Sequence, residues 1–245
     1  MTDPRLEVIG RRIAGVRRVI AVSSGKGGVG KSMIATALAL TLRRSGHRVG
    51  LLDLDFTSPS THVILGVEGL QPEEERGIIP PLAHGLRYMS IVFYAADEPA
   101  PLRGADISDA IIELMAITRW GELDYLVIDM PPGIGDATLD MIRLTPGISF
   151  LVVTTPSRVA FETVRKLLTL LGELEVPIVG VVENMVMRPS SRIRDQVGAL
   201  GVPYLGVISF DTELEDALGD VEALLRTGFA VAVGGIASEA DRRSP

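Results

Sequence analysis

A glycine-rich segment between an expected strand and an expected helix constrains the fold of this chain more than any other feature. Residues 25–32 read GKGGVGKS, with four glycines among eight residues. The apolar run Arg18–Ser23 is typical of a buried strand, and Met33–Arg44 has helical spacing that stops at Gly46. Glycines let successive backbone N–H groups turn inward, and the start of a helix adds its positive end. The segment therefore predicts a loop that holds phosphate groups at the carboxyl end of a strand.

The residues of this loop have separate expected roles. The pattern G-x-x-x-x-G-K-[ST] assigns Lys31 to the β and γ phosphates of a nucleotide and the Ser32 hydroxyl to magnesium. The residues expected to line the nucleotide are Gly25, Gly27, Gly28, Val29, Gly30, Lys31, Ser32 and Met33. A glycine-rich turn without a ligand is the alternative, and the strand–loop–helix context disfavours it.

Strands and helices alternate along the rest of the chain. Apolar runs typical of buried strands recur at Val49–Leu54, Arg87–Phe93, Tyr125–Asp129, Phe150–Thr154, Pro177–Glu183 and Tyr204–Ile208. Helical spacing recurs at Ile107–Trp120, Val159–Leu171 and Val221–Arg226. The Pro-, Glu- and Gly-rich stretch Gly69–Gly85 is expected to be an irregular loop. Together these patterns predict one doubly wound α/β domain over residues 1–245, with a mostly parallel sheet and helices on both faces.

The two ends of the chain carry weaker signals. Residues 1–16 have apolar positions at helical spacing and predict a leading helix packed on the domain, with a basic membrane-surface helix as the alternative. Residues 230–245 are expected to be a frayed tail. No apolar run reaches the ~18 to 20 residues of a membrane span. No apolar region or cleavage site follows Arg11 and Arg12, so a cytoplasmic location is expected.

Composition excludes several classes of function. The net charge of -7 gives no broad positive field for nucleic acid or an anionic membrane, so nucleic-acid binding is not expected. The chain has no cysteine, which excludes disulfides, thiolate metal sites and a cysteine nucleophile. Its only lysines are Lys26, Lys31 and Lys166, and two of them lie in the glycine-rich loop. At these two positions the chain has the compact ammonium group of lysine, which the planar guanidinium of arginine would not replace. The two charges repel unless phosphate neutralises both.

The run KGGVGKS resembles the deviant Walker-A motif of the MinD/ParA group of P-loop ATPases. Other segments resemble the Mrp/ApbC-like iron-sulfur carrier branch of that group: LDLDF at 52–56, SPS at 58–60, RG at 103–104, WGELDY at 120–125, DMPPGIGD at 129–136 and VENM at 182–185. The resemblance spans residues 18–185. It implies that Lys26 is the signature lysine, which reaches the nucleotide of the partner subunit in a homodimer that forms on ATP binding.

The resemblance also implies roles for residues at the strand ends. Asp129 is the Walker-B carboxylate expected to hold magnesium through water. Asp55 matches the position that orients the attacking water, and Asp53 is expected to support the metal or Lys31. Asn184 matches the position that recognises adenine. From the residues alone, a solvated strand end for the two aspartates and a turn-forming buried Asn184 are the alternatives. Because no N-K-x-D guanine motif occurs, ATP is preferred over GTP.

The residues that follow VENM differ from the pattern of the iron-sulfur carriers. Carriers have a C-x-x-C motif shortly after VENM, whereas Val186–Arg194 here reads VMRPSSRIR. His47, His62 and His84 are scattered, and we interpret them as surface or packed residues rather than replacement ligands. Ser209 stands where the family usually has proline, and the G-K-P expected near the end is absent. We therefore expect no iron-sulfur cluster on the isolated chain.

Two functions follow as hypotheses. The first is a slow, partner-stimulated ATPase switch related to iron-sulfur cluster assembly, which acts on an unknown protein partner or with a cysteine-bearing paralogue that supplies the cluster. The alternative is a MinD/ParA-type positioning or scaffold ATPase that acts on a protein or on the nucleoid. Against membrane docking, Ser238–Pro245 is polar and lacks an apolar stripe. Arg188, Arg192 and Arg194 form the one local basic candidate for nucleic acid, and a solvated face is the preferred interpretation.

Overall fold

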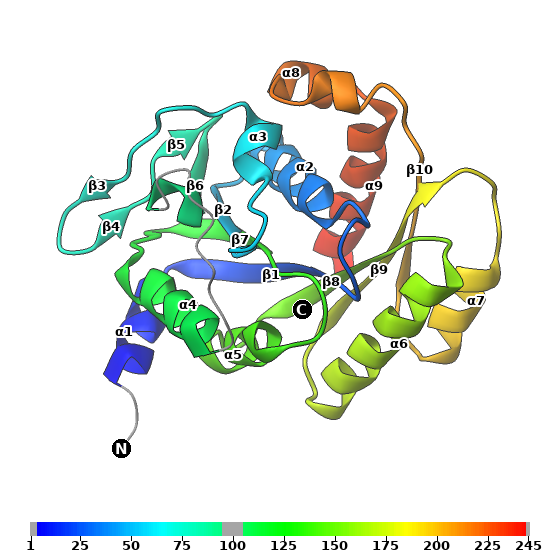
Figure 1. The fold of residues 1–245 in the computed structure, drawn as a ribbon, viewed down its shortest axis with the longest axis horizontal. Coiled ribbons are helices and arrows are strands. Elements are labelled where there is room, and N and C mark those ends of the chain that lie inside the picture. Colours follow the sequence, from blue (N-terminus) through cyan, green and yellow to red (C-terminus); the bar gives the residue numbers. More distant parts are fainter. Residues whose placement is uncertain (1–3, 95–104, 244–245) are drawn as a thin grey trace.

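The computed structural model describes residues 4–94 and 105–243, and an eight-stranded sheet runs through its centre (Figure 1). The strands of this sheet are β1 Val16–Ser24, β2 Val49–Asp53, β5 Leu82–Ala83, β6 Leu86–Ser90, β7 Leu123–Asp129, β8 Ser149–Thr154, β9 Ile178–Val186 and β10 Tyr204–Ser209. Their order is β10-β9-β8-β1-β7-β2-β6-β5, and all neighbours are parallel except β5 and β6. A separate two-stranded ribbon pairs β3 Glu73–Glu74 with β4 Ile78–Ile79.

Helices cover both faces of the sheet and bury two hydrophobic clusters against it (Figure 1). One face carries α2 Lys31–Arg44, α3 Thr61–Leu65, α8 Val221–Leu224 and α9 Gly228–Arg243. The other carries α1 Pro4–Ile13, α4 Ala105–Ile117, α5 Asp136–Leu144, α6 Arg158–Glu173 and α7 Arg192–Ala199. The predicted mostly parallel sheet with helices on both faces is therefore confirmed. Within the described ranges, no helix combines the length and apolarity needed to cross a membrane.

Several strands and helices have other bounds than the sequence predicts, and local hydrogen bonds explain some of these differences. The predicted strand Arg87–Phe93 ends at Ser90, whose side chain accepts the N–H of Val92 and starts the 3₁₀ helix η1 Ile91–Phe93. The stretch expected to be an irregular loop, Gly69–Gly85, contains β3, β4 and β5. The predicted helix Ile107–Trp120 ends earlier, at Ile117, because the N–H of Arg119 donates to the carbonyl of Ile78 at 2.7 Å instead of continuing the helix. The segment RG at 103–104 lies outside the described residues.

The C-terminal segment is a packed helix, so the expectation of a frayed tail is wrong for residues 230–243. Helix α9 buries a stripe of small and medium apolar side chains that includes Val233, Ile236 and Ala240. This stripe contacts α2 and β10. The paired glycines Gly234 and Gly235 weaken the helical pattern in the sequence, and packing against α2 supplies the stabilisation that the local sequence lacks.

A polar contact fastens the end of α9 to the sheet. The carboxylate of Asp241 accepts hydrogen bonds from the Tyr125 hydroxyl and from Arg18, the latter at 2.5 Å. These two donors lower the pKa of Asp241. Because the pKa is lower in the folded than in the unfolded protein, the stabilisation is complete above about pH 4 and is lost as the pH falls through the folded value.

The replacement Asp241→Asn is expected to lower the free energy of unfolding at pH 7 by about 0.5–1 kcal/mol, the range for a half-exposed ion pair. The difference from the wild type should shrink as the pH falls below about 4, because the carboxyl of the unfolded wild type is then protonated and that of the folded protein follows at lower pH. Urea unfolding at pH 7 and pH 2.5 measures both values. A difference of the same size at the two pH values would contradict this account.

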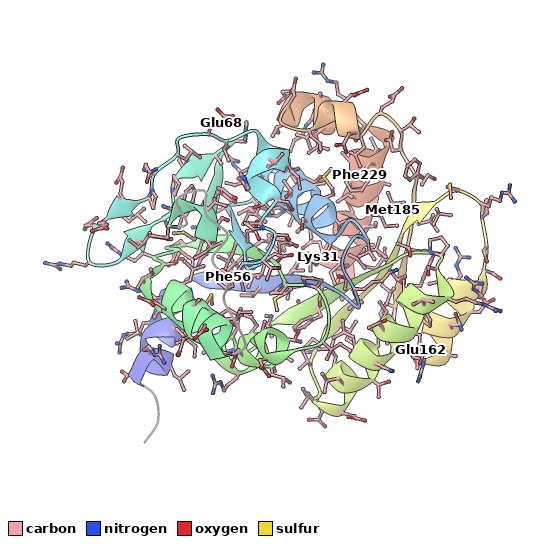
Figure 2. All side chains as sticks on the ribbon, viewed as in Figure 1. Lys31, Phe56, Glu68, Glu162, Met185 and Phe229 are labelled. Atoms are coloured by element: carbon pink, nitrogen blue, oxygen red, sulfur yellow. The ribbon has the colours of Figure 1, made fainter. Side chains whose placement is uncertain are left out.

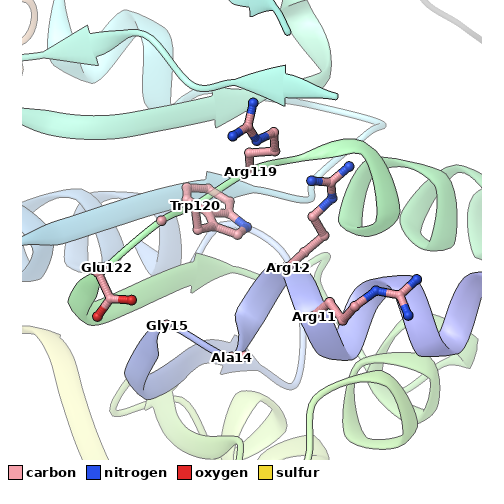
Figure 3. Close-up of a pocket in the computed structure, with 8 residues that line it drawn as sticks. Arg11, Arg12, Ala14, Gly15, Arg119, Trp120 and Glu122 are labelled. Carbon is pink, nitrogen blue, oxygen red and sulfur yellow. The ribbon is translucent and has the colours of Figure 1, made fainter. Parts of the chain in front are cut away.

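The leading helix α1 packs on α4 through Ile9 and Ile13, and a shallow pocket lies beside its C-terminal end (Figure 3). The arginines of this pocket connect the elements around it. Arg12 donates to the carbonyl of Ala116 at 3.0 Å and to that of Arg76 at 2.9 Å. Arg119 donates to the carbonyl of Glu75 at 2.5 Å. The pocket lies at the amino ends of β1 and β7, at the opposite end of the strands from the glycine-rich loop.

Candidate functional site

The glycine-rich loop connects the carboxyl end of β1 to the first residue of α2 near the middle of the molecule, where Figure 2 labels Lys31. Gly28 and Gly30 have φ values of 75° and 81°, a region that favours glycine. The Ser24 hydroxyl donates to the carbonyl of Lys26 at 2.9 Å and holds the start of the loop. Lys26 itself is exposed, whereas Lys31 is only 6% exposed. The two loop lysines therefore have different environments.

Lys31 contacts two of the three residues predicted to hold or support magnesium at this site, Ser32 and Asp129. Its Nζ atom donates to Oδ1 of Asp129 at 2.5 Å and to the hydroxyl of Ser32 at 3.3 Å. Burial raises the pKa of Asp129 to about 6, although the Lys31 ammonium opposes this shift. The second carboxylate oxygen of Asp129, Oδ2, is buried and has no hydrogen-bond partner among the described residues. A hard cation or its bound water fits an orphaned carboxylate oxygen next to a hydroxyl.

The two aspartates at the end of β2 have different contacts. Asp53 is fully buried, and its oxygens accept from the backbone of Asp55 and from the backbone and side chain of Thr61. No hydrogen bond joins Asp53 to Lys31 in the described part of the chain. Asp55 accepts on Oδ1 from the Thr57 hydroxyl at 2.7 Å and lines the cavity beside the glycine-rich loop. Of the two, Asp55 is therefore the carboxylate that a nucleotide in this cavity would meet.

A cavity of about 540 Å³ extends along the outside of the loop. Its lining combines the loop with the segment after β2, and includes Lys26, Gly27, Gly28, Gly30, Lys31, Ser32, Met33, Asp55, Thr57, Ser58, Ser60 and Pro132. This volume lies in the range of pockets that hold small-molecule ligands and cofactors. Most of the residues predicted from the loop motif therefore share one cavity with the predicted carboxylate Asp55.

Asn184 reaches the loop from β9. Its Nδ2 atom donates to the carbonyl of Val29 at 2.9 Å, and a Cβ atom at Gly30 would lie only 2.3 Å from that nitrogen. Asn184 also lines a small second cavity together with Met33 and Phe210. The structure thus brings Asn184 to the glycine-rich loop, and its contact with adenine stays a prediction.

The loop also depends on a close approach between Gly25 and α6. A Cβ atom at Gly25 would lie 2.6 Å from Cβ of Thr163 and 2.7 Å from the backbone nitrogen of Val164. Because Val164 contributes a backbone atom, no side-chain rotation relieves this clash. Gly27 is a matched control, since a Cβ atom there has nothing within 4 Å.

We expect Gly25→Ala to lower the free energy of unfolding by about 1–3 kcal/mol, the usual cost of overpacking. Gly27→Ala should stay within about 0.5 kcal/mol of the wild type. Urea unfolding of the two variants without nucleotide provides the comparison. Equal stabilities for the two variants would show that α6 does not constrain the loop as described.

Two of the three arginines considered as a nucleic-acid surface make local contacts, and the third, Arg188, is exposed. Arg192 donates to the carbonyl of Pro156, and the guanidinium of Arg194 lies 5.3 Å from the centre of the Tyr204 ring. Sequence reasoning did not single out Thr61 or Tyr88, which contact the buried Asp53 network. No motif marks these two residues, because their roles depend on contacts between α3, β2 and β6.

Comparisons with known proteins agree with this geometry. Residues 15–225 match the ParA family model, which is described as NUBPL iron-transfer P-loop NTPase. An iron-sulfur cluster carrier protein of Pseudomonas fragi is 44% identical over 179 residues, which cover 71% of this chain and 62% of that protein. A protein of the same name from Aquifex aeolicus is 36% identical over 222 residues, which cover 84% of this chain and 61% of that protein. The chain thus spans about three-fifths of the length of these two relatives.

Solved structures add evidence on the fold and on nucleotide binding by a relative. A nucleotide-binding protein of Archaeoglobus fulgidus, solved in complex with ADP, has a TM-score of 0.76 and 31% identity, and the match covers 90% of this chain and 93% of that one. MinD of Pyrococcus horikoshii, complexed with Mg-ADP, has a TM-score of 0.67 at 22% identity, with 92% and 96% covered, and shows likeness of fold. With the site and the family match in agreement, the chain belongs to the ParA family of NUBPL-type iron-transfer P-loop NTPases.

Proposed function

We propose that this protein is an ATP-hydrolysing dimeric switch, related to the iron-sulfur cluster carriers, that binds no cluster on its isolated chain. One observation carries the proposal. The buried Lys31 contacts Asp129 and Ser32 at the edge of a cavity that an exposed second lysine and one carboxylate, Lys26 and Asp55, also line. Phosphates in this cavity would meet the ammonium group of Lys31, the backbone of the loop and the N-terminus of α2.

Each group has one task in the proposed reaction. Backbone N–H groups of residues 27–32 bind the phosphates, and Lys31 leaves Asp129 to bind the β and γ phosphate oxygens. Ser32 and, through water, Asp129 would hold Mg²⁺, which supplies charge neutralisation when bound. Asp55 orients the attacking water, and Asn184 contributes to recognition of the base. Asp53, whose oxygens are occupied by Asp55 and Thr61, supports the segment that carries Asp55.

Lys26 supports the dimeric part of the proposal. It is exposed, it lines two neighbouring cavities, and it has no ion pair in residues 4–94 and 105–243. A charge that is not neutralised within its own subunit suits a phosphate supplied by a second copy of the chain. We propose that a homodimer closes over ATP and that an additional protein partner stimulates turnover.

A nucleotide assay tests the proposed function directly. Steady-state phosphate release is expected to be slow with Mg-ATP, to stop when EDTA removes the metal, and to be at least about tenfold slower with GTP. Calorimetric titration with a non-hydrolysable ATP analogue measures binding separately from turnover. Failure of the protein to bind either nucleotide would refute the assignment of the loop.

The chemistry of the chain also predicts the result of cluster reconstitution. A [4Fe-4S] cluster is normally held by four thiolates, and this chain has no cysteine. Its histidines are separated: His47 packs on Tyr125, His84 bonds the carbonyl of Leu65, and His62 lies in α3. Carboxylates are harder ligands that suit other metals.

After anaerobic incubation with iron and sulfide and then desalting, the isolated protein is expected to retain far less than stoichiometric iron. Iron analysis and the visible absorption spectrum check this expectation. Stoichiometric iron with a cluster absorption band would contradict the proposal. Uptake only after mixing with a cysteine-bearing paralogue would support a heteromeric complex in which the paralogue supplies the thiolates.

A further inference from the structure

One buried carboxylate holds both ends of the segment 55–60, which borders the candidate nucleotide cavity. Asp53 is the last residue of β2 and is fully buried. Its Oδ1 atom accepts the N–H of Asp55 at 3.0 Å, at the start of the segment. Its Oδ2 atom accepts the N–H of Thr61 at 3.2 Å and the Thr61 hydroxyl at 2.7 Å, directly after the segment. The two ends of this loop are thus bound to one side chain.

The hydroxyl of Thr61 is itself held by a second buried group. Tyr88 lies on β6, the parallel neighbour of β2, and its hydroxyl is 2.9 Å from that of Thr61. Since the Thr61 proton is donated to Asp53, its oxygen accepts the proton of Tyr88. Both Thr61 and Tyr88 are fully buried. A hydrogen-bond chain therefore runs from Tyr88 through Thr61 to Asp53, connecting β6, α3 and β2.

This series of hydrogen bonds fixes the part of the cavity that carries Asp55. The segment between the two bound ends includes Thr57 and Ser58, which donate to Oδ1 of Asp55 at 2.7 and 3.1 Å. Asp55, Thr57, Ser58 and Ser60 all line the cavity beside the glycine-rich loop. Burial raises the pKa of Asp53, whereas the bonds from Thr61 and Asp55 lower it and favour its ionised, accepting form.

We propose that Thr61 and Tyr88 are positioning residues for ATP hydrolysis, which act through Asp53 to hold residues 55–60 so that Asp55 faces the nucleotide. The inference rests on the proposed function, because it concerns the rate of that reaction. Neither residue touches the cavity, so neither contributes directly to nucleotide binding. Loss of the Thr61 hydroxyl should therefore reduce kcat and leave KM nearly unchanged.

The experiment compares Thr61→Val, which keeps the shape and removes the hydroxyl, with Thr61→Ser, which keeps the hydroxyl. We expect kcat for Mg-ATP to fall about 10–100-fold in Thr61→Val, the usual result of misplacing a reacting group by about 1 Å. KM should stay within about threefold, and Thr61→Ser should stay within about threefold of the wild type in both constants. Thr145→Val is a matched control, because Thr145 is also fully buried and its hydroxyl has no partner among the described residues.

A second substitution tests whether Tyr88 acts through Thr61. Tyr88→Phe alone is expected to lower kcat about 3–10-fold. In the Thr61→Val background it should change kcat by less than about twofold, because the Thr61 hydroxyl that connects Tyr88 to Asp53 is already gone. Additive losses in the double variant would overturn the hydrogen-bond chain. Equal impairment in Thr61→Ser and Thr61→Val would overturn the role of the hydroxyl, as would a kcat for Thr61→Val within threefold of the wild type.

Hydrogen exchange of the nucleotide-free protein gives a measurement that does not depend on turnover. Amides in peptides covering residues 54–61 are expected to exchange about tenfold faster in Thr61→Val than in the wild type or in Thr61→Ser. Unchanged exchange would overturn the proposal. If the wild type hydrolyses no ATP, the proposed function fails, and the exchange rates then decide separately whether the Thr61 hydroxyl holds the segment.

Discussion

The replacement Lys31→Ala is expected to weaken binding of Mg-ATP at least about 100-fold, which corresponds to about 3 kcal/mol. In our account the ammonium of Lys31 binds the β and γ phosphate oxygens through charge-assisted hydrogen bonds in a buried setting. No other described lysine is buried at the loop, so nothing replaces it. Isothermal titration with an ATP analogue measures the loss.

Lys166→Ala is the matched control, because Lys166 is exposed on α6 and lies outside the cavity. It should bind nucleotide as the wild type does. Since Lys31→Ala leaves Asp129 buried without its partner, unfolding curves without nucleotide must show that the variant is folded under the titration conditions. A folded Lys31→Ala protein with wild-type affinity would remove the basis for the assignment of the loop.

The replacement Lys26→Ala is expected to have the opposite pattern, with turnover reduced about 100-fold and ATP affinity within about threefold of the wild type. Lys26 is exposed and has no ion pair in the described ranges, so its removal leaves the single-subunit site intact. If it contacts the phosphates of a second copy, its charge acts only in the closed dimer, where it stabilises the charge that develops during transfer.

Lys26→Arg sharpens this test, because a planar guanidinium does not reproduce the compact ammonium at a crowded phosphate. We expect it to recover less than about a tenth of wild-type turnover. Phosphate release and analogue titration on the same preparations separate turnover from binding. Wild-type turnover in Lys26→Ala would exclude a role for this lysine in the reaction.

Local signals were sufficient to predict the centre of the site. The order of strand, glycine-rich loop and helix depends on neighbouring residues, so the motif at 25–32 and its position after β1 could be inferred from the sequence. Buried parallel strands are continuous apolar runs, and Asp53 and Asp129 each follow such a run, which put both at strand ends. In the structure the two strand ends are adjacent, since Asp53 pairs with Asp129 between β2 and β7.

Contacts between distant segments account for what the sequence did not predict. Helix α9 is stabilised by packing on α2 and by the contact of Asp241 with Tyr125. No local sequence pattern near residue 230 indicates either contact. The same holds for the partners of Asp53. Its expected support of the metal or Lys31 was inferred from position at a strand end, whereas its hydrogen bonds depend on Thr61 and Tyr88 from two other elements.

Sedimentation velocity of the Asp55→Ala protein tests the central claim, that ATP closes two copies of this chain into a switch. The substitution is expected to slow hydrolysis so that bound ATP persists during the run. With Mg-ATP we predict a species of about twice the monomer mass, and with ADP or without nucleotide a monomer. Adding Lys26→Ala should reduce the ATP-dependent dimer. The same mass with and without ATP would contradict the account.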